Sequence, residues 1–223
     1  MFKPLTHLAA ILAVLASLAS SMALAQTPAG PASTASPASP VVRVRATIEK
    51  IDASSITVKD RSGEIVTLMR AADMPVNEVY AIQLADIKPG SYVGTAAMPQ
   101  PDGSQVALEV LVFPEAARGS SEGHYPWDLQ PQSTMTNATV ADLSAAPSTV
   151  PGGQKMTLKY KDGEKVVIVP ASAPVVTFKP ASLDDQKVLL VPGARVLINA
   201  QDKYGKPTAL RMIVGRTGFA PPM

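Results

Sequence analysis

The residues best suited to binding chemistry lie close together in the middle of the chain. Five side chains within and just after residues 118–132 could contact a ligand: His124, Tyr125, Trp127, Asp128 and Met135. Imidazole and thioether groups are ligands that suit Cu(I), and an indole ring can lie over a cation. These five are therefore our candidate binding residues, with His124 and Met135 as the alternative metal ligands.

Two other interpretations fit the same segment. The rings of Tyr125 and Trp127 could fill the seam between two folded modules and fix their angle, because large aromatic rings contribute much buried area. Alternatively, the segment could dock a protein partner of the cell envelope. The spacing of the residues does not by itself choose among a seam, a docking surface and a metal site.

The sequence has few of the residues that form metal sites or acid–base pairs in enzymes. His124 is the histidine that remains once His7 leaves with the expected leader, and the chain has no cysteine, so a multi-ligand zinc site is not expected. The chain contains no Walker-type glycine loop. Asp184 and Asp185 are a poor acid–base pair, because adjacent side chains usually diverge. We therefore expect a non-enzymatic protein without a cofactor.

Residues 1–25 have the pattern of a secretory signal peptide. Lys3 provides a basic start, an apolar run follows, and Ala23-Leu24-Ala25 fits the small-residue rule for cleavage. Residues 26–40 are rich in Pro, Ala, Ser and Thr, which predicts a disordered linker. No later segment approaches the roughly 18 apolar residues of a membrane-spanning helix. The sequence thus predicts export to the periplasm, with no integral membrane span after cleavage.

The composition excludes one class of partner and predicts which side chains form the core. A formal net charge of +2, with basic residues spread among acidic ones, provides no electrostatic footprint for nucleic acid. The chain is 46% hydrophobic but only 4% aromatic, so the core should consist of aliphatic side chains and Met, which suits packed strands. Without cysteine, this core must stabilise the fold without disulfides.

One sequence pattern occurs twice. Residues 46–52 resemble residues 138–144, and residues 87–93 resemble residues 190–196, each of the latter pair containing a Pro-Gly turn. Self-similarity at this scale predicts two tandem β-modules. The expected organisation is a signal peptide at 1–25, a linker at 26–40, a first module at 41–117, an inter-module segment at 118–132, a second module at 133–218 and a tail at 219–223.

Alternating hydrophobic residues predict short strands in each module. Val42 and Val44 alternate with Arg43 and Arg45, which is the pattern of a strand with valines in the core and arginines in water. A less regular stretch with a helical turn is expected at residues 71–86. Five short strands with one irregular connection predict an all-β protein of two small OB-like barrels, since closure removes exposed strand edges. An open five-stranded sandwich is the alternative.

Several stretches resemble a known group of proteins. They are residues 85–94 (ADIKPGSYVG), 126–129 (PWDL) and 133–140 (STMTNATV), with the closing Val214-Gly215-Arg216. The chain is similar to a family of exported bacterial proteins of unknown function, built from small OB-like β-repeats, whose members often carry the automatic label of metal ABC transporter permease. The resemblance implies no catalytic residues. A permease would need several spanning helices, which this sequence does not contain.

These observations predict an exported, periplasmic, non-enzymatic binding or scaffolding protein, with an envelope protein as a candidate partner. The alternative is a soluble metal-handling protein or an accessory of a metal ABC transporter.

Overall fold

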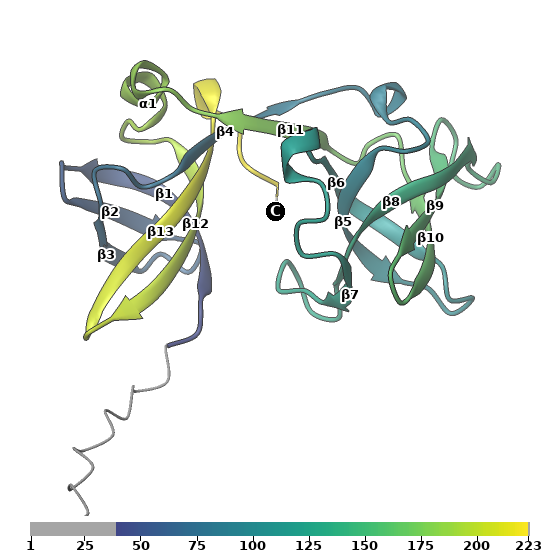
Figure 1. Ribbon diagram of the computed structural model, residues 1–223, viewed down its shortest axis with the longest axis horizontal. Coiled ribbons are helices and arrows are strands. Elements are labelled where there is room, and N and C mark those ends of the chain that lie inside the picture. The colour runs from purple at the N-terminus through teal and green to yellow at the C-terminus, as the bar shows by residue number, and fades with distance from the viewer. Residues whose placement is uncertain (1–38, 223) are drawn as a thin grey trace, which may run out of the picture. The chain divides into compact units, whose positions relative to one another are not determined.

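Strands predominate in the computed structural model, which describes residues 39–222 (Figure 1). The expected signal peptide and nearly all of the expected linker lie outside the described residues. In the first half of the chain the strands are β1 (Val42–Ile51), β2 (Ser55–Asp60), β3 (Ile65–Arg70), β4 (Val76–Ala81), β5 (Tyr92–Pro99), β6 (Gln105–Val112) and β7 (Gly123–Pro126). In the second half they are β8 (Thr134–Ala145), β9 (Gln154–Tyr160), β10 (Gly163–Val169), β11 (Val175–Pro180), β12 (Arg195–Lys203) and β13 (Lys206–Gly215).

Helical structure is short in the described part of the chain. It comprises the α-helix α1 (Leu183–Leu189) and the 3-10 turns η1 (Leu84–Asp86), η2 (Glu115–Ala117) and η3 (Arg216–Gly218). None of these helices has the length and hydropathy needed to cross a bilayer. The predicted all-β class is confirmed.

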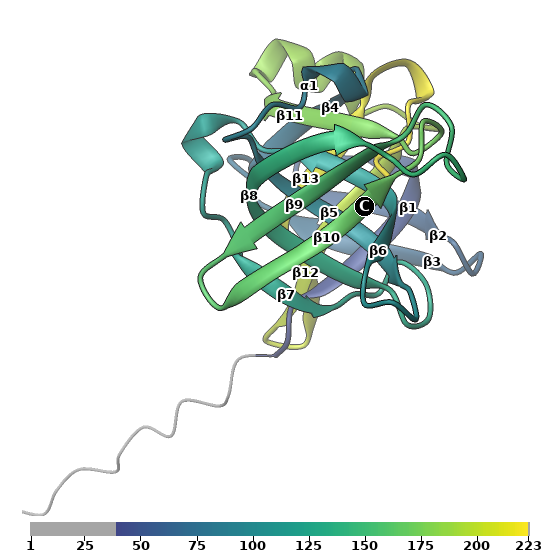
Figure 2. The same ribbon diagram turned by 90° about the vertical axis from the view of Figure 1, so that its right-hand side faces the viewer.

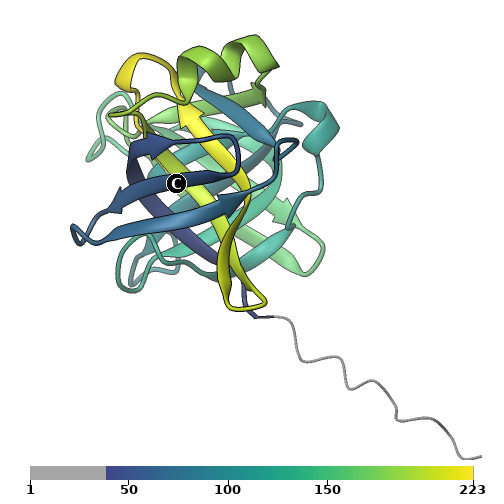
Figure 3. The same cartoon turned by 90° about the vertical axis from the view of Figure 1, so that its left-hand side faces the viewer.

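Five strands close a first barrel. β1 pairs with β2, β2 with β3, β3 with β13, β13 with β12, and β12 with β1. Figure 3 shows this ring face on, with the early strands in purple and blue and the late ones in yellow and green. Its core mixes both halves of the sequence, because Ile48 and Ile56 pack in one cluster with Ile198 and Met212.

Five further strands close a second ring in the same way. β5 pairs with β8, β8 with β9, β9 with β10, β10 with β6, and β6 with β5. Figure 2 faces this ring. Its core again joins the two halves of the sequence, since Val93 and Val110 pack with Met156 and Leu158. A β-barrel is therefore present, and the open sandwich is not observed in residues 39–222.

The strand composition of the rings differs from the expectation of one barrel per contiguous module. Each ring takes three strands from one half and two from the other, so neither residues 41–117 nor residues 133–218 close a ring alone. The chain crosses between rings through β4 and β11, which pair with each other antiparallel (Figure 1).

The stretch expected to be irregular, residues 71–86, thus contains the crossover strand β4 and ends in η1. Val79 of β4 lies opposite Phe178 of β11, and a third hydrophobic cluster surrounds this pair. The cluster includes Leu111 from one ring and Leu197 from the other. Apolar packing therefore holds the two rings together and positions the faces that meet between them.

Candidate ligand-binding cleft

A cleft of about 350 Å³ opens between the two rings. Its apolar lining combines both rings, the crossover strand β11 and the segment before β8: Leu111, Phe113, Trp127, Met135, Phe178, Leu197 and Ile213. Ligand sites in proteins are typically concave, mostly apolar, and contain a few placed polar groups. This cleft combines such an apolar surface with several polar side chains, among them Arg43, Asn137 and Arg211.

Two lateral rows of side chains form the wall contributed by the first ring. Arg43 of β1 lies opposite Asn199 of β12, which in turn lies opposite Arg211 of β13. Directly paired residues project from the same face of a sheet. The next row across the same strands places Leu197 between Arg45 and Ile213. A polar row and a row with two apolar side chains therefore run side by side on this wall.

The opposite wall belongs to the second ring. Gly94 of β5 is paired with Asn137 on one side and with Leu111 on the other. A Cβ atom at position 94 would lie 2.5 Å from Asn137 Oδ1 and 3.0 Å from a ring carbon of Phe113. Glycine is needed at this position because any side chain would displace groups that line the cleft.

Asn137 is held in one orientation by hydrogen bonds from its amide nitrogen. Nδ2 donates to the carbonyl oxygens of Ser120 (3.3 Å) and Ser121 (3.0 Å) and to the hydroxyl oxygen of Tyr125 (2.9 Å). The side chain is 5% exposed, and its Oδ1 is buried without a hydrogen-bond partner among residues 39–222. An unpaired buried acceptor costs roughly 1–3 kcal/mol.

Trp127 presents a second buried polar group at the cleft. Its indole Nε1 has no hydrogen-bond partner in the described part of the chain. The backbone N–H of Trp127 donates to the Ser133 carbonyl oxygen at 2.8 Å, and the Ser133 hydroxyl donates to the Trp127 carbonyl oxygen at 3.1 Å. The Arg43 guanidinium lies 3.9 Å from the centre of the indole ring. The hydrogen bonds with Ser133 hold the loop before β8 in shape, and the contact with Arg43 attaches this loop to the first ring.

Asp128 joins the same loop to β1 through two arginines. Its carboxylate accepts a hydrogen bond from Arg45 at 2.8 Å and one from Arg43 at 3.5 Å. Partial burial would raise the pKa of Asp128, but the hydrogen bond from Arg45 and the charges of both arginines hold that pKa below its ordinary value. The Arg45 side chain is only 11% exposed, so the expectation that it points into water is wrong.

His124 lies on the other face of its strand. It is paired with Thr136, whereas the neighbouring Tyr125 is paired with Met135. Successive residues of a strand point to opposite faces, so His124 is separated from the cleft that Tyr125 and Met135 line. His124 Nδ1 is 2.9 Å from the Thr136 hydroxyl, and its ring stacks on Tyr160. Burial and the charge of Lys165 lower the pKa of His124.

The structure thus brings together three of the five candidate residues, Tyr125, Trp127 and Met135, at the cleft. Asp128 binds Arg45 and so holds the loop beside the cleft, and His124 lies on the opposite face of β7. The alternative metal ligands His124 and Met135 therefore do not share a face. Within residues 39–222 no group of three or more His, Asp or Glu side chains has the geometry to hold a metal ion.

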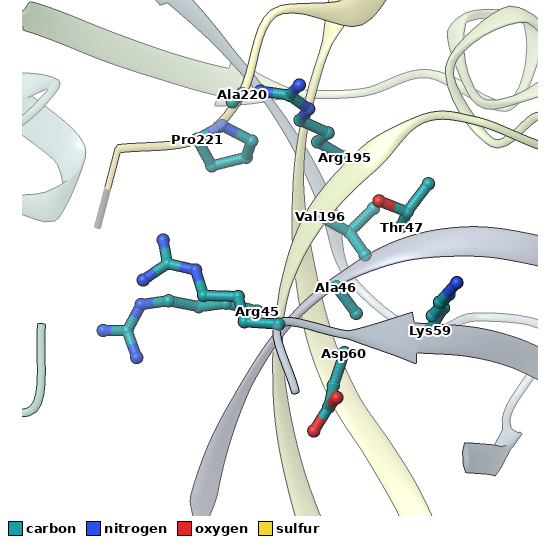
Figure 4. Close-up of a pocket in the computed structure, with 10 residues that line it drawn as sticks. Arg45, Ala46, Thr47, Lys59, Asp60, Arg195, Val196, Ala220 and Pro221 are labelled. Atoms are coloured by element: carbon teal, nitrogen blue, oxygen red, sulfur yellow. The ribbon is translucent and has the colours of Figure 1, made fainter. Parts of the chain in front are cut away.

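A smaller pocket of about 240 Å³ lies beside the cleft and is strongly basic. Its charged lining residues are Arg45, Lys59, Asp60, Arg61 and Arg195. Figure 4 shows that Arg195, Arg45 and Lys59 carry their charged ends toward different sides of the pocket. The carboxylate of Asp60 accepts hydrogen bonds from the backbone N–H groups of Ser62 and Glu64. Because the charges do not converge on one point, the cleft is the better candidate site.

Glu109 is a buried carboxyl group on β6, paired with Ala96 of β5. It is 2% exposed, and neither carboxyl oxygen has a hydrogen-bond partner among the described residues. Burial raises the pKa of Glu109 to about 8, although the charges of Arg45 and Arg61 oppose this rise.

Sequence reasoning missed the arginines and the asparagine of the cleft. Arg43 was placed in water by strand alternation, and Arg211 lies on an alternating strand as well. Asn137 belongs to an Asn-x-Thr triplet, the formal acceptor sequence for N-glycosylation. This triplet does not indicate a buried hydrogen-bond acceptor. Alternation identifies the outward face of a strand correctly, but it does not reveal that a second ring covers that face.

No family model, no curated protein and no solved structure matches the chain.

Proposed function

We propose that this chain is an exported, non-enzymatic binding protein that holds a small ligand in the cleft between its two rings. The observation that carries the proposal is the pair of buried polar atoms, Asn137 Oδ1 and Trp127 Nε1, at a cleft that combines apolar and polar side chains. One is an acceptor and the other a donor, and a ligand with complementary groups would satisfy both. Desolvated polar groups of this kind determine specificity in ligand sites.

Export to the periplasm rests on residues 1–25, with Lys3 followed by an apolar run and a small-residue cleavage pattern. The similarity to an exported family, which residues 126–129 and 133–140 carry, is consistent with that location. A scaffolding role, or docking of an envelope protein, remains an alternative function of the same segment. We favour ligand binding because the segment lines a cleft rather than a flat surface.

We further propose that the two halves are copies of one OB-like unit. Equivalent positions pair in the same way: Thr47 lies opposite Arg195, and its counterpart Thr139 lies opposite Tyr92. Register shifts also recur at equivalent places, between Ala96 and Ala97 in one half and between Asn199 and Ala200 in the other. Matching registers of this kind support a duplicated sequence that folds with exchanged strands.

The metal-handling alternative receives no support from the positions of His124 and Met135, and we do not extend the proposal to it.

A fluorescent probe tests the proposal. Anilinonaphthalene sulfonate combines an apolar ring system with an N–H donor and an anion, and Trp127, the single tryptophan of the chain, can transfer excitation energy to it. We expect saturable binding to the folded protein with quenching of Trp127. Ala117 lines the cleft while its neighbour Ala116 does not, so Ala117→Phe should block binding and Ala116→Phe should not.

Circular dichroism would establish that both variants keep the fold. Absence of saturable binding to the wild type, or equal binding by the two folded variants, would contradict the proposed site.

A further inference from the structure

The charge of the cleft identifies the class of ligand. No Asp or Glu is among the residues that line the cleft, whereas Arg43 and Arg211 both are. The two arginines flank Asn199 in one row across β1, β12 and β13. Neighbouring strands lie about 4.8 Å apart, so the backbones of the two arginine positions are about 10 Å apart. The wall therefore has an excess of positive charge.

The two arginines differ in their contacts with other side chains. Arg43 stacks on Trp127 and is 3.5 Å from a carboxylate oxygen of Asp128. Arg211 is exposed and has no hydrogen bond or ion pair with any side chain in the described part of the chain. Arg211 is thus the cation of the cleft that is available to a ligand.

Arg211 stands beside an apolar surface. Ile213 follows it by two residues on β13, and Leu197 is the cross-strand neighbour of Ile213. An apolar ligand body on Leu197 and Ile213 would place a terminal anionic group within reach of the guanidinium of Arg211. A small inorganic anion would bind the guanidinium of Arg211 but would not cover the apolar surface. A neutral hydrocarbon would cover the apolar surface but would not bind the guanidinium.

We propose that the ligand is a small organic anion, with a carboxylate or sulfonate bound by Arg211, an apolar body against Leu197 and Ile213, and one N–H or O–H group that donates to Asn137 Oδ1. This inference rests on the proposed function of the cleft and deepens it.

A pair of nearly isosteric probes tests the inference. Naphthaleneacetic acid and naphthaleneacetamide share their ring system and size, but only the acid is an anion at neutral pH. Isothermal titration calorimetry at low ionic strength should show that the wild type binds the acid roughly tenfold more tightly than the amide, as expected for one charge-assisted interaction. Arg211→Gln should abolish this preference.

Arg195→Gln is the matched control. It removes the same charge from a neighbouring strand, but Arg195 lines the basic pocket rather than the cleft. The acid preference should survive in this variant. If the preference for the acid disappears equally in both variants, it depends on the overall electrostatic potential of the protein. That result would overturn the role of Arg211.

The failures of the two proposals are distinguishable. If the acid and the amide bind the wild type equally and Ala117→Phe blocks both, the cleft binds ligands but the anionic class is wrong. If neither naphthalene probe nor anilinonaphthalene sulfonate binds, the proposed function itself is contradicted.

Discussion

The guanidinium of Arg43 lies 3.9 Å from the centre of the Trp127 ring, and this contact joins β1 of one ring to the loop that precedes β8 of the other. Asp128, the next residue of the loop, binds Arg45 on the same strand at 2.8 Å. A cation over an aromatic face and an adjacent charge-assisted hydrogen bond both favour one placement of the loop. The loop in turn forms part of the cleft.

We predict that Trp127→Ala lowers the free energy of unfolding by roughly 1–3 kcal/mol, since it removes both the stacking on Arg43 and the packing of a large ring. Urea denaturation followed by circular dichroism measures this change. Trp127→Phe should retain most of the stability because it keeps an aromatic face. An unchanged stability together with lost binding of the fluorescent probe would assign Trp127 to the ligand alone.

Stability should depend on the protonation of Glu109. Its pKa of about 8 in the folded protein is above the ordinary value of 4.5, because burial disfavours the carboxylate. Between these values the unfolded chain loses the proton and the folded protein keeps it. The free energy of unfolding should therefore fall as pH rises from 4.5 to 8, by up to about 1.4 kcal/mol per pH unit from this group.

Glu109→Gln should remove this pH dependence. We expect its melting temperature to exceed that of the wild type by more at pH 8 than at pH 5. Glu164→Gln, at an exposed position on β10, is the control and should show no such trend. A difference between Glu109→Gln and the wild type that stays constant from pH 5 to pH 8 would contradict the prediction.

Arg216 should stabilise the junction of β4 and β13 through Glu78. Its guanidinium donates to both carboxylate oxygens of Glu78, at 2.7 and 2.8 Å, and to Asp185 at 2.9 Å. Glu78 is 4% exposed, so Arg216→Met would leave a buried carboxylate whose remaining ionic partner is Lys179 at 3.5 Å. We expect the melting temperature to fall by several degrees at pH 7.

The effect of Arg216→Met should shrink in acid. The hydrogen bond from Arg216 lowers the pKa of Glu78 below 4.5, so the stabilisation is present above pH 4.5 and is lost as pH falls through the lowered value. Lys187→Met breaks a fully surface ion pair with Asp184 and should have little effect at either pH. Equal losses for the two variants at pH 7 would count against the prediction.

The exchange of strands predicts that half of the chain cannot fold as a monomer. A fragment of residues 39–132 would contain β1, β2 and β3 without β12 and β13, which close their ring. Its unpaired edges should leave it unfolded or associated. When mixed with residues 133–222, it should form a folded one-to-one complex, which circular dichroism and size-exclusion chromatography would detect. A folded monomer of either fragment alone would contradict the exchanged pairing.

Much of the local structure could be predicted from the sequence, because alternation of side chains along a strand is a local property. The alternation of Val42 and Val44 with Arg43 and Arg45 identified β1, although Val42 is 52% exposed, so the expectation that it lies in the core is wrong. Three of the five candidate residues, Tyr125, Trp127 and Met135, line the cleft. The place of His124 was not predictable in the same way, because the register of β7 on β8 decides which face it occupies.

The sequence by itself determined where strands form, which side of each is apolar and that the core lacks disulfides, since these follow from residue type and period. Only the tertiary structure decided which strands complete each ring, and therefore that Arg43, Asn137 and Arg211 line one cleft. The physical reason is that similar strands offer nearly equivalent partners. The choice among them depends on how β4, β11 and the apolar cluster around Val79 and Phe178 pack across the whole molecule.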